Sequence, residues 1–327
     1  MQAALIDVDR QLQVTTVPDP TPQPDEVVVQ VAAAGICGTD LHILHGDYPS
    51  RLPLIPGHEF AGVIVALGSG VDPDRLGEHV VVDPNIACHS CRFCREGRVQ
   101  LCEDYQAIGV TQDGALAERV AVPLALCFPL PEHVDLTLAA LLEPIACAVH
   151  GIDMIGADIG RRVAIYGGGT MGLAMLQLAR LNGAASVDVI EPATFKHQAA
   201  IDLGARSVRP TATDGDSWDV VIDASGNPGA IGDGIAHTGR GGTFLQFGVA
   251  TPHATVSISP YRIYEDEIRI LGSVCPANAF QRACDLFDRL QLEPLVSHRV
   301  PLREVPAALE AFAAGETKKV LVLPEHQ

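Results

Sequence analysis

Four cysteines between positions 88 and 102 constrain this chain more than any other feature of its sequence. Cys88, Cys91, Cys94 and Cys102 follow one another in C-x2-C-x2-C-x7-C spacing. Thiolates at such short intervals can converge on one tetrahedral Zn²⁺, with Zn–S distances of about 2.3 Å. Because four thiolates leave no open position for a substrate, such a site is structural. The alternative is a cluster of disulfides, which would require an oxidising compartment.

The remaining sequence favours a reducing compartment. The opening residues, MQAALIDVDRQLQ, lack the basic start and apolar core of a signal peptide. No uninterrupted apolar run reaches the ~18–20 residues that span a bilayer. We therefore expect a cytoplasmic protein, in which nine cysteines, an odd number, suit metal ligation better than disulfides.

Length and charge limit the class of protein further. A chain of 327 residues exceeds the size at which one core usually keeps growing, so two domains are expected. The chain carries 22 basic and 40 acidic residues, for a net charge of −18. Such an acidic surface repels phosphate backbones and anionic lipids, which argues against nucleic acid and membrane partners and favours a small-molecule substrate.

The first 145 residues combine strand-like runs with two polar islands. The runs VVVQV (27–31), GVIVALG (62–68) and EHVVVDP (78–84) lie between Gly- and Pro-rich turns, which predicts a small β-rich domain. The islands are AGICGTDLHILHG (34–46) and PGHEFAGVI (56–64). Their Cys, His and carboxylate side chains are the types that bind zinc, and together they could leave a coordination position open.

A second pattern indicates a dinucleotide site. Gly167, Gly169 and Gly172 follow a short apolar strand that ends at Tyr166, in G-x-G-x-x-G spacing. Thr170 and Met171 complete this turn, and an Ala- and Leu-rich helix comes after it. A strand before the glycines and a helix after them make the motif a phosphate-binding turn, because the helix N-terminus offers unpaired N–H groups to the anion.

Glu191 indicates which dinucleotide is bound. It follows the strand SVDVI, 24 residues after Gly167, where a carboxylate can accept bonds from the ribose 2′-OH and would repel a 2′-phosphate. Lys196 is the nearest cation, so NAD is favoured over NADP. The alternative for Glu191 is a solvated loop carboxylate.

Alternating strands and helices continue from Asp219 to Val274 and predict a parallel, doubly wound sheet. Ala224, Gly226 and Gly248 lie at strand ends, where the nicotinamide half of the cofactor would rest. In the tail, AFQRACDLFDRLQ and PLREVPAALEAFAAG have helical spacing, and KKVLVLP is strand-like.

Three of these elements together resemble one family. The G-x-C-G-T-D element (35–40), the GHE-x-x-G element (57–62) and the four-cysteine lobe are similar to those of the zinc-dependent medium-chain dehydrogenases. The resemblance implies a GroES-like catalytic domain (1–145 and 276–327) and a Rossmann domain (146–275). It also implies two zinc ions per chain, one structural and one catalytic.

The resemblance assigns the catalytic ligands. Cys37 and His58 would bind the catalytic zinc, and Glu59 would be a direct or alternating ligand with a catalytic role. The polyol and threonine dehydrogenase branch has a further Glu near the domain junction, and LLEPIACAVHG places Glu143 there. Cys147 is the alternative, since it lies four residues farther on and could share a helical face with Glu143.

The implied reaction is oxidation of a secondary hydroxyl of a polyol, sugar or similar polar alcohol by NAD. A zinc ion with an open position lowers the pKa of a bound hydroxyl, and the hydride passes to the nicotinamide. Thr39 would accept a bond from the substrate oxygen, and the resemblance implies a relay through the cofactor ribose to His42. A surface role is the alternative for His42.

Other functions and an assembly remain open at this point. An L-threonine 3-dehydrogenase or a cyclitol or amino-cyclitol dehydrogenase would use the same zinc and cofactor, and a non-catalytic zinc- and NAD-binding protein is a more distant alternative. Relatives in this branch imply a homotetramer, or else a homodimer. The apolar run GTFLQFGV (242–249) is the predicted edge strand that pairs between subunits.

Overall fold

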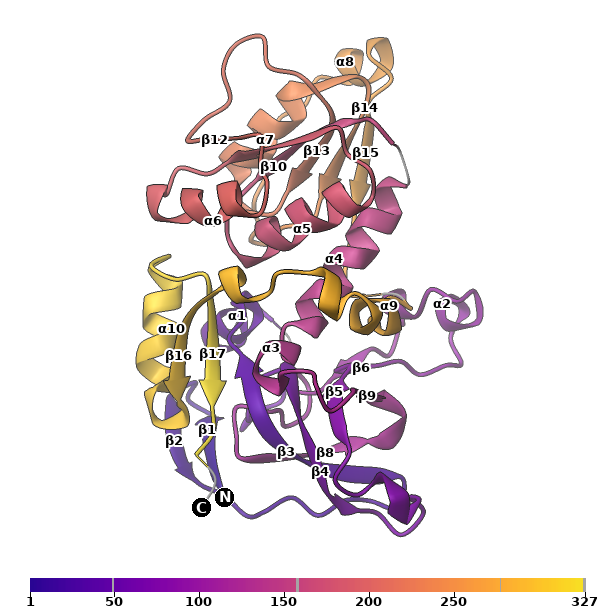
Figure 1. The fold of residues 1–327 in the computed structure, drawn as a ribbon, viewed down its shortest axis with the longest axis vertical. Coiled ribbons are helices and arrows are strands. Elements are labelled where there is room, and N and C mark those ends of the chain that lie inside the picture. Colours follow the sequence, from indigo (N-terminus) through magenta and orange to yellow (C-terminus); the bar gives the residue numbers. More distant parts are fainter. Residues whose placement is uncertain (49, 157–158, 277, 326–327) are drawn as a thin grey trace. The chain divides into compact units, whose positions relative to one another are not determined.

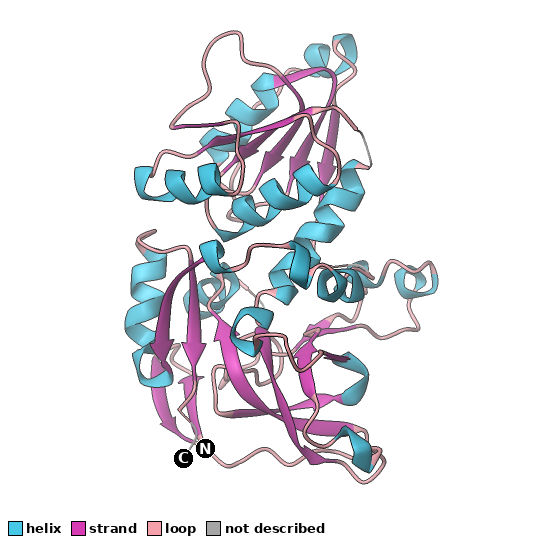
Figure 2. Ribbon diagram, viewed as in Figure 1, coloured by secondary structure: helices cyan, strands magenta, loops and turns pink. Residues whose placement is uncertain are grey.

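A computed structural model describes residues 1–48, 50–156, 159–276 and 278–325 of the chain. It divides into two compact units, Met1–Pro144 with Phe280–Gln327, and Ile145–Ala279. The domain boundaries expected from the sequence are residues 145 and 276. Figures 1 and 2 show the sheet that each unit carries.

The first unit is built on a mostly antiparallel, seven-stranded sheet. Its strands run in the order β16-β17-β3-β4-β5-β9, with β8 also paired to β3. Only β16 and β17 pair in parallel. The strands are β3 (Glu26–Gly35), β4 (Glu59–Leu67), β5 (His79–Val82), β8 (Arg119–Pro123), β9 (Cys127–Pro129), β16 (Val296–Pro301) and β17 (Lys319–Leu323). Two hairpins accompany it: β1 (Gln2–Ile6) with β2 (Leu12–Thr16), and β6 (Asn85–Ile86) with β7 (Gln106–Ala107).

The core of this unit explains why these segments are strands. Val29 and Val31 of β3, Phe60 and Ile64 of β4 and Val320 of β17 are all at most 1% exposed and belong to one hydrophobic cluster. The β-branched residues fit a pleated, buried surface. The β-rich, GroES-like prediction for this unit is confirmed.

Helices in the first unit are short. They are α1 (Gly38–His45), α2 (Arg92–Arg95), α3 (Leu136–Ala139), α9 (Phe280–Asp285) and α10 (Val305–Ala313), and α4 (Leu142–Ile155) begins in this unit and continues into the second. The 3₁₀ turns are η1 (Pro73–Arg75), η2 (Val99–Leu101), η3 (Leu124–Leu126), η5 (Phe287–Arg289), η6 (Glu293–Leu295) and η7 (Leu302–Glu304). Helix α9 is shorter than its sequence pattern predicted, because the chain tightens into the 3₁₀ turn at Phe287.

The second unit contains a six-stranded, all-parallel sheet in the order β12-β11-β10-β13-β14-β15. Its strands are β10 (Arg162–Tyr166), β11 (Ser186–Ile190), β12 (Ser207–Arg209), β13 (Trp218–Asp223), β14 (Thr238–Gln246) and β15 (Arg269–Gly272). Its helices are α5 (Thr170–Leu181), α6 (His197–Asp202), α7 (Pro228–His237) and α8 (Pro260–Glu265), with a 3₁₀ turn η4 (Thr194–Lys196). The predicted doubly wound, Rossmann-type sheet is confirmed.

The strand order reverses between β10 and β13, which are neighbours in space. Helix α5 leads from β10 to β11 in one direction, and α7 leads from β13 to β14 in the other. Because such crossovers are right-handed, the two helices cover opposite faces of the sheet, as Figure 1 shows. In this fold a ligand usually binds at the carboxyl ends of the two strands at such a reversal, which here are β10 and β13.

The edge-strand prediction is wrong. The run GTFLQFGV contributes to β14, which lies between β13 and β15. Phe244 is 1% exposed and Leu245 is fully buried, as a continuous apolar run indicates for a central strand of a parallel sheet. The edges of this sheet are β12 and β15. Within the described residues, no helix has both the length and the apolar character needed to cross a bilayer.

Candidate active site and metal centres

Three of the predicted zinc ligands come together at one end of the strand pair β3–β4. Cys37 is the N-cap residue of α1, just after β3 ends at Gly35, and His58 comes just before Glu59, the first residue of β4. Gly35 pairs with Glu59 in the antiparallel register, which brings the two polar islands side by side. One ligand atom from each of Cys37, His58 and Glu59 lies within 4.8 Å of the other two.

Asp40 holds Cys37 and faces His58. Its Oδ2 accepts a hydrogen bond of 2.9 Å from the Cys37 backbone N–H, which caps the first turn of α1. Its Oδ1 lies 3.7 Å from Nδ1 of His58, and both side chains are buried. A carboxylate facing one ring nitrogen leaves the other, Nε2, for a metal.

The charges around His58 are mainly negative. Burial alone would lower the pKa of His58, but the Cys37 thiolate, followed by Asp40 and Glu143, outweighs burial and raises the pKa well above its usual range. Burial raises the pKa of Asp40. A buried group of anionic side chains around an imidazole favours any cation that can be placed among them.

A buried lysine holds Glu59. Nζ of Lys319, on β17, donates to both carboxylate oxygens of Glu59 at 2.7 Å and to the Ile36 carbonyl at 2.9 Å. Lys319 is 4% exposed and Glu59 is 1% exposed. Burial lowers the pKa of Lys319, yet Glu59 first and then Cys37 and Glu143 raise it above the ordinary value, so the ammonium stays charged.

The topology explains how the tail of the chain reaches this site. Strand β17 pairs with β3 so that Leu321 lies opposite Gly35, and β3 pairs with β4. A Cβ at Gly35 would overlap the Glu59 carboxylate, so only glycine leaves room for it. Gly57 has a φ of 99°, the left-handed region, and a Cβ there would lie 2.6 Å from the Leu116 nitrogen.

Glu143 lies in the first turn of α4 and is 7% exposed. Among the described residues, the group of ligand atoms within 4.8 Å of one another does not include it. Its charge is nevertheless close enough to raise the pKa of both His58 and Lys319. Cys37, His58, Glu59 and Glu143 offer sulfur, nitrogen and oxygen donors, which are the atom types that bind Zn²⁺. Cys147, the alternative, is half-buried on the next turn of α4.

The predicted proton-transfer residues lie on α1. Thr39 Oγ1 is 3.8 Å from Cys37 Sγ, which places the hydroxyl beside the ligand group. His42 is one turn farther along, with its side chain 26% exposed and its Nδ1 3.6 Å from Oδ2 of Asp47. One hydroxyl at the ligand group and one imidazole near solvent are therefore carried by the same helix.

The four cysteines form a separate cluster whose sulfur atoms lie within 4.8 Å of one another. In a tetrahedral site with Zn–S bonds of about 2.3 Å, neighbouring sulfur atoms are about 3.8 Å apart, which is within this limit. Backbone N–H groups point at the sulfurs: Cys88 donates to Cys102 at 3.2 Å and Cys91 to Cys88 at 3.3 Å. The Ser90 hydroxyl and the backbone amides of Ser90 and Cys91 lower the pKa of Cys88 to about 6. None of these four cysteines is in a disulfide, so the cluster fits a zinc ion.

The Gly-rich turn has the geometry that a pyrophosphate needs. Gly167 has a φ of 110°, and a Cβ at Gly172 would overlap the Gly167 carbonyl, so both positions require glycine. At Gly169, the N-cap of α5, a Cβ would point into open space. The backbone there is accessible to a ligand, and Thr170 and Met171 form the first turn of α5.

Glu191 is anchored beside this turn. Its Oε2 accepts from the Gly168 N–H at 2.8 Å and its Oε1 from the Ala193 N–H at 2.8 Å, and the residue is 5% exposed. It is therefore not a solvated loop carboxylate. Lys196 lies close, with Nζ 3.6 Å from Glu191 Oε2. Each carboxylate oxygen keeps a lone pair for a further donor, such as a ribose hydroxyl.

The other predicted cofactor residues follow β13 and β14, on the other side of the strand-order reversal from the Gly-rich turn that follows β10. The Ala224 N–H donates to the Tyr166 carbonyl at 2.8 Å, and a Cβ at Gly167 would be 3.2 Å from the Ala224 carbonyl carbon. Gly226 has a φ of 68°. A Cβ at Gly248 would lie 2.8 Å from the Ser225 nitrogen, so the ends of β13 and β14 approach each other at backbone distance.

Comparison with known proteins agrees with both units. The family described as "Alcohol dehydrogenase GroES-like domain" matches residues 23–132, and "Zinc-binding dehydrogenase" matches residues 170–289. D-arabinitol dehydrogenase 1 of Uromyces fabae is 35% identical over 316 residues, which cover 92% of this chain and 90% of that protein. The chain is a zinc-dependent medium-chain dehydrogenase.

Two further relatives of this dehydrogenase carry different names. L-threonine 3-dehydrogenase of Caldanaerobacter subterraneus subsp. tengcongensis is 31% identical over 326 residues, covering 92% of each chain. A protein of Sinorhizobium meliloti 1021, described as a zinc-binding dehydrogenase and solved bound to NADP, has a TM-score of 0.95 at 37% identity and covers 99% of both chains. The relatives are thus all dehydrogenases, and the two curated ones differ in the substrate that their names give.

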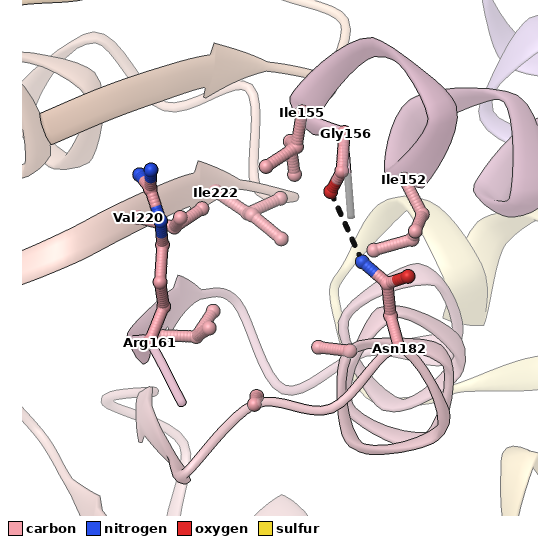
Figure 3. Close-up of a pocket in the computed structure, with 10 residues that line it drawn as sticks. Ile152, Ile155, Gly156, Arg161, Asn182, Val220 and Ile222 are labelled. Carbon is pink, nitrogen blue, oxygen red and sulfur yellow. Dashed lines mark hydrogen bonds between the residues drawn. The ribbon is translucent and has the colours of Figure 1, made fainter. Parts of the chain in front are cut away.

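The dehydrogenase also contains a cavity that is unsuited to a cofactor (Figure 3). It lies between the carboxyl ends of α4 and α5 and one face of β10 and β13, and has a volume of about 20 Å³. Apolar side chains such as Ile155 and Val220 line it. The Asn182 side-chain amide donates a hydrogen bond of 3.1 Å to the Gly156 carbonyl. A cavity of this size holds at most about one water molecule.

Lys319 is the residue of the ligand group that sequence reasoning missed. A lysine heading a strand that is otherwise apolar, KVLVL, indicates burial, and a buried lysine requires an anionic partner. Its partner lies 260 residues away in the chain, which no local pattern reveals. The role of Asp40 was also missed, although its position three residues after Cys37 is that of a capping-box carboxylate.

Proposed function

We propose that this dehydrogenase oxidises a secondary hydroxyl of a polyol, sugar or similar polar alcohol and transfers the hydride to NAD. The observation that carries this proposal is the buried convergence of Cys37, His58 and Glu59, with the charge of Glu143 nearby. The names of the relatives, among them an arabinitol dehydrogenase, support the substrate class.

Cys37, His58 and Glu143 would hold the catalytic zinc, with Glu59 held back by Lys319. When bound, zinc supplies a Lewis acid that polarises an alcohol oxygen. The protein contributes the arrangement of the donors, because Asp40 accepts a bond from the Cys37 backbone and faces Nδ1 of His58. Glu59 becomes an alternating ligand only if it leaves the ammonium of Lys319.

Proton removal would be the task of α1. The Thr39 hydroxyl, beside Cys37, would accept the hydrogen bond of the substrate hydroxyl. His42 is exposed enough to exchange a proton with solvent, and Asp47 faces it. The four-cysteine cluster would hold the second, structural zinc and take no part in the reaction.

NAD is the proposed cofactor because Glu191 occupies the ribose position. Its carboxylate is fixed by two backbone N–H groups, so it cannot swing away to admit a 2′-phosphate. NADP is the alternative, supported by the NADP bound to the Sinorhizobium meliloti relative and by Lys196 next to Glu191. Equilibrium binding of NADH and NADPH tests this choice: a tenfold preference for NADPH would refute the role of Glu191.

The substrate is tested with a panel of polyols, cyclitols, L-threonine and simple alcohols, followed by NADH absorbance. Reduction of NAD by polyols is the expected result. Turnover of L-threonine alone would favour the amino-alcohol alternative, which the Caldanaerobacter relative supports. Binding of zinc and NADH without turnover of any alcohol would favour the non-catalytic alternative.

We also propose a cytoplasmic homo-oligomer, a tetramer or a dimer. The paired subunit would bind at β15, which the structure pairs on one side only, with β14, in the part of the chain that it describes. Exposed apolar side chains lie on the same unit: Tyr261 is 69% exposed, Tyr264 79% and Val274 50%. An uncovered edge strand is a ready template for pairing with a second copy. Sedimentation as a monomer would refute this assembly.

A further inference from the structure

Asp223 is a buried carboxylate with no place in the chemistry above. It is the last residue of β13, at the carboxyl ends of the parallel strands of the second unit, and is fully buried. The four side-chain and backbone groups that donate to its carboxylate are all neutral. A charge buried at such a place requires several well-aligned donors.

These donors come from the ends of two neighbouring strands. Oδ1 accepts from the Ser225 N–H at 3.1 Å and from the Ser225 hydroxyl at 2.6 Å. Oδ2 accepts from the Gly226 N–H at 3.0 Å and from the Gln246 side-chain amide at 2.8 Å. The first three donors lie on the loop after β13, and the fourth is on the last residue of β14.

The same carboxylate sets the spacing between the two loops. Gln246 also donates to the Gly248 carbonyl at 2.6 Å, and the Gly248 N–H donates to the Asp223 carbonyl at 2.8 Å. A Cβ at Gly248 would lie 2.7 Å from Asp223 Oδ2, so the loops touch at backbone distance around this one group.

The arrangement also reaches the pyrophosphate turn. The Ala224 N–H, next to Asp223, donates to the Tyr166 carbonyl at 2.8 Å, and Ala224 lies against Gly167. A shift of residues 224–226 would therefore displace the start of the Gly-rich turn as well as the end of β14.

We propose that Asp223 is a positioning residue that shapes the nicotinamide and pyrophosphate part of the cofactor site through the two loops. This inference rests on the proposed binding of a nicotinamide dinucleotide. Glu191, beside which the adenosine part would bind, is held by the Gly168 and Ala193 N–H groups and not by the loops that Asp223 bonds, so we expect adenosine binding to change little.

Asp223→Asn tests the proposal, because asparagine has the right shape but replaces one oxygen by NH₂. In either orientation that NH₂ faces a backbone N–H, of Ser225 or of Gly226, which cannot turn away. The matched control is Asp219→Asn, on the same strand. There the carboxylate accepts from Arg162, at the amino ends of the strands.

Dissociation constants for NADH and for adenosine, which lacks the phosphate, are measured by fluorescence and calorimetry, with hydrogen exchange of residues 224–226 and 246–249. For Asp223→Asn we expect the NADH constant to rise about tenfold, faster exchange in both loops, and an adenosine constant within about twofold of the wild type. Asp219→Asn should leave both constants unchanged. If Asp223→Asn does not fold, Gln246→Ala, which removes the amide bonds to Asp223 and to the Gly248 carbonyl, should raise the NADH constant by a smaller factor and leave the adenosine constant unchanged.

Unchanged NADH binding in a folded Asp223→Asn protein, or in Gln246→Ala when only that variant folds, overturns the proposal. An equal loss of NADH and adenosine binding also overturns it, because that result indicates general disruption. Failure of the wild-type protein to bind NADH is a different result, which refutes the proposed cofactor.

Discussion

Replacing Lys319 by methionine tests the buried ion pair behind the zinc ligands. The substitution keeps an unbranched, flexible side chain that ends before the ammonium, and it removes three hydrogen bonds, two to Glu59 at 2.7 Å and one to the Ile36 carbonyl at 2.9 Å. It leaves the Glu59 carboxylate, only 1% exposed, without its cation. Removing one partner of a buried pair costs about 3–5 kcal/mol.

That loss should be visible in thermal and urea unfolding. For a domain of about 150–250 residues it corresponds to a fall in Tm of about 6–20 °C. Lys318→Met is the matched control, because the neighbouring ammonium is half-buried and donates to the Pro294 carbonyl and not to a carboxylate. We expect it to cost about 1 kcal/mol or less.

A double-mutant cycle isolates the pair itself. If Glu59 is destabilised because it has lost its cation, Glu59→Gln should relieve much of the cost of Lys319→Met, with an interaction energy of about 2–3 kcal/mol. The cycle is measured by urea unfolding with zinc bound and after chelation. Additive effects of the two substitutions, within about 0.5 kcal/mol, would refute the view that Lys319 neutralises Glu59.

Three further predictions concern the rest of the chain. Asp188 accepts from Arg206 and from the Trp218 indole at 2.7 Å, and although burial raises its pKa, these bonds lower it overall. Its contribution is therefore present above the unfolded pKa of about 3.9 and is lost as the pH falls through the lower folded value, so Asp188→Asn should cost about 1–3 kcal/mol at pH 7 and progressively less as the pH falls below about 4; a constant difference in urea unfolding would contradict this. Cys94→Ser should remove one zinc by elemental analysis and lower the Tm, with the turnover of the remaining folded enzyme unchanged; slowed hydride transfer in that fraction would show that the cluster is not purely structural. Glu191→Ser should weaken NADH binding about tenfold and improve NADPH binding, and an unchanged ratio of the two dissociation constants would mean that Glu191 does not select the cofactor.

The parts of the site that follow from sequence are those encoded by short spacing. The four cysteines and the Gly167 turn each lie within a few residues, so local geometry largely determines where their atoms converge. The parallel sheet was predictable for the same reason, because each strand and helix has its own local pattern of apolar residues.

The parts that sequence did not reveal depend on strand order. Lys319 meets Glu59 only because β17 pairs with β3 and β3 with β4, and this order follows from packing of the whole unit. The same limit explains the error at β14: a buried apolar run is compatible with several places in a sheet, and Phe244 is central only because β15 adds beyond it.

Metal content of the Cys37→Ser protein tests the central claim most directly. We predict two zinc ions per wild-type chain and one in this variant, with no NAD reduction by any alcohol and with NADH binding retained, because the dinucleotide residues lie in the other unit. Cys147→Ser is the control, since it removes the alternative ligand and should keep both zinc ions and the activity. Two zinc ions and full NAD reduction in Cys37→Ser would contradict the account.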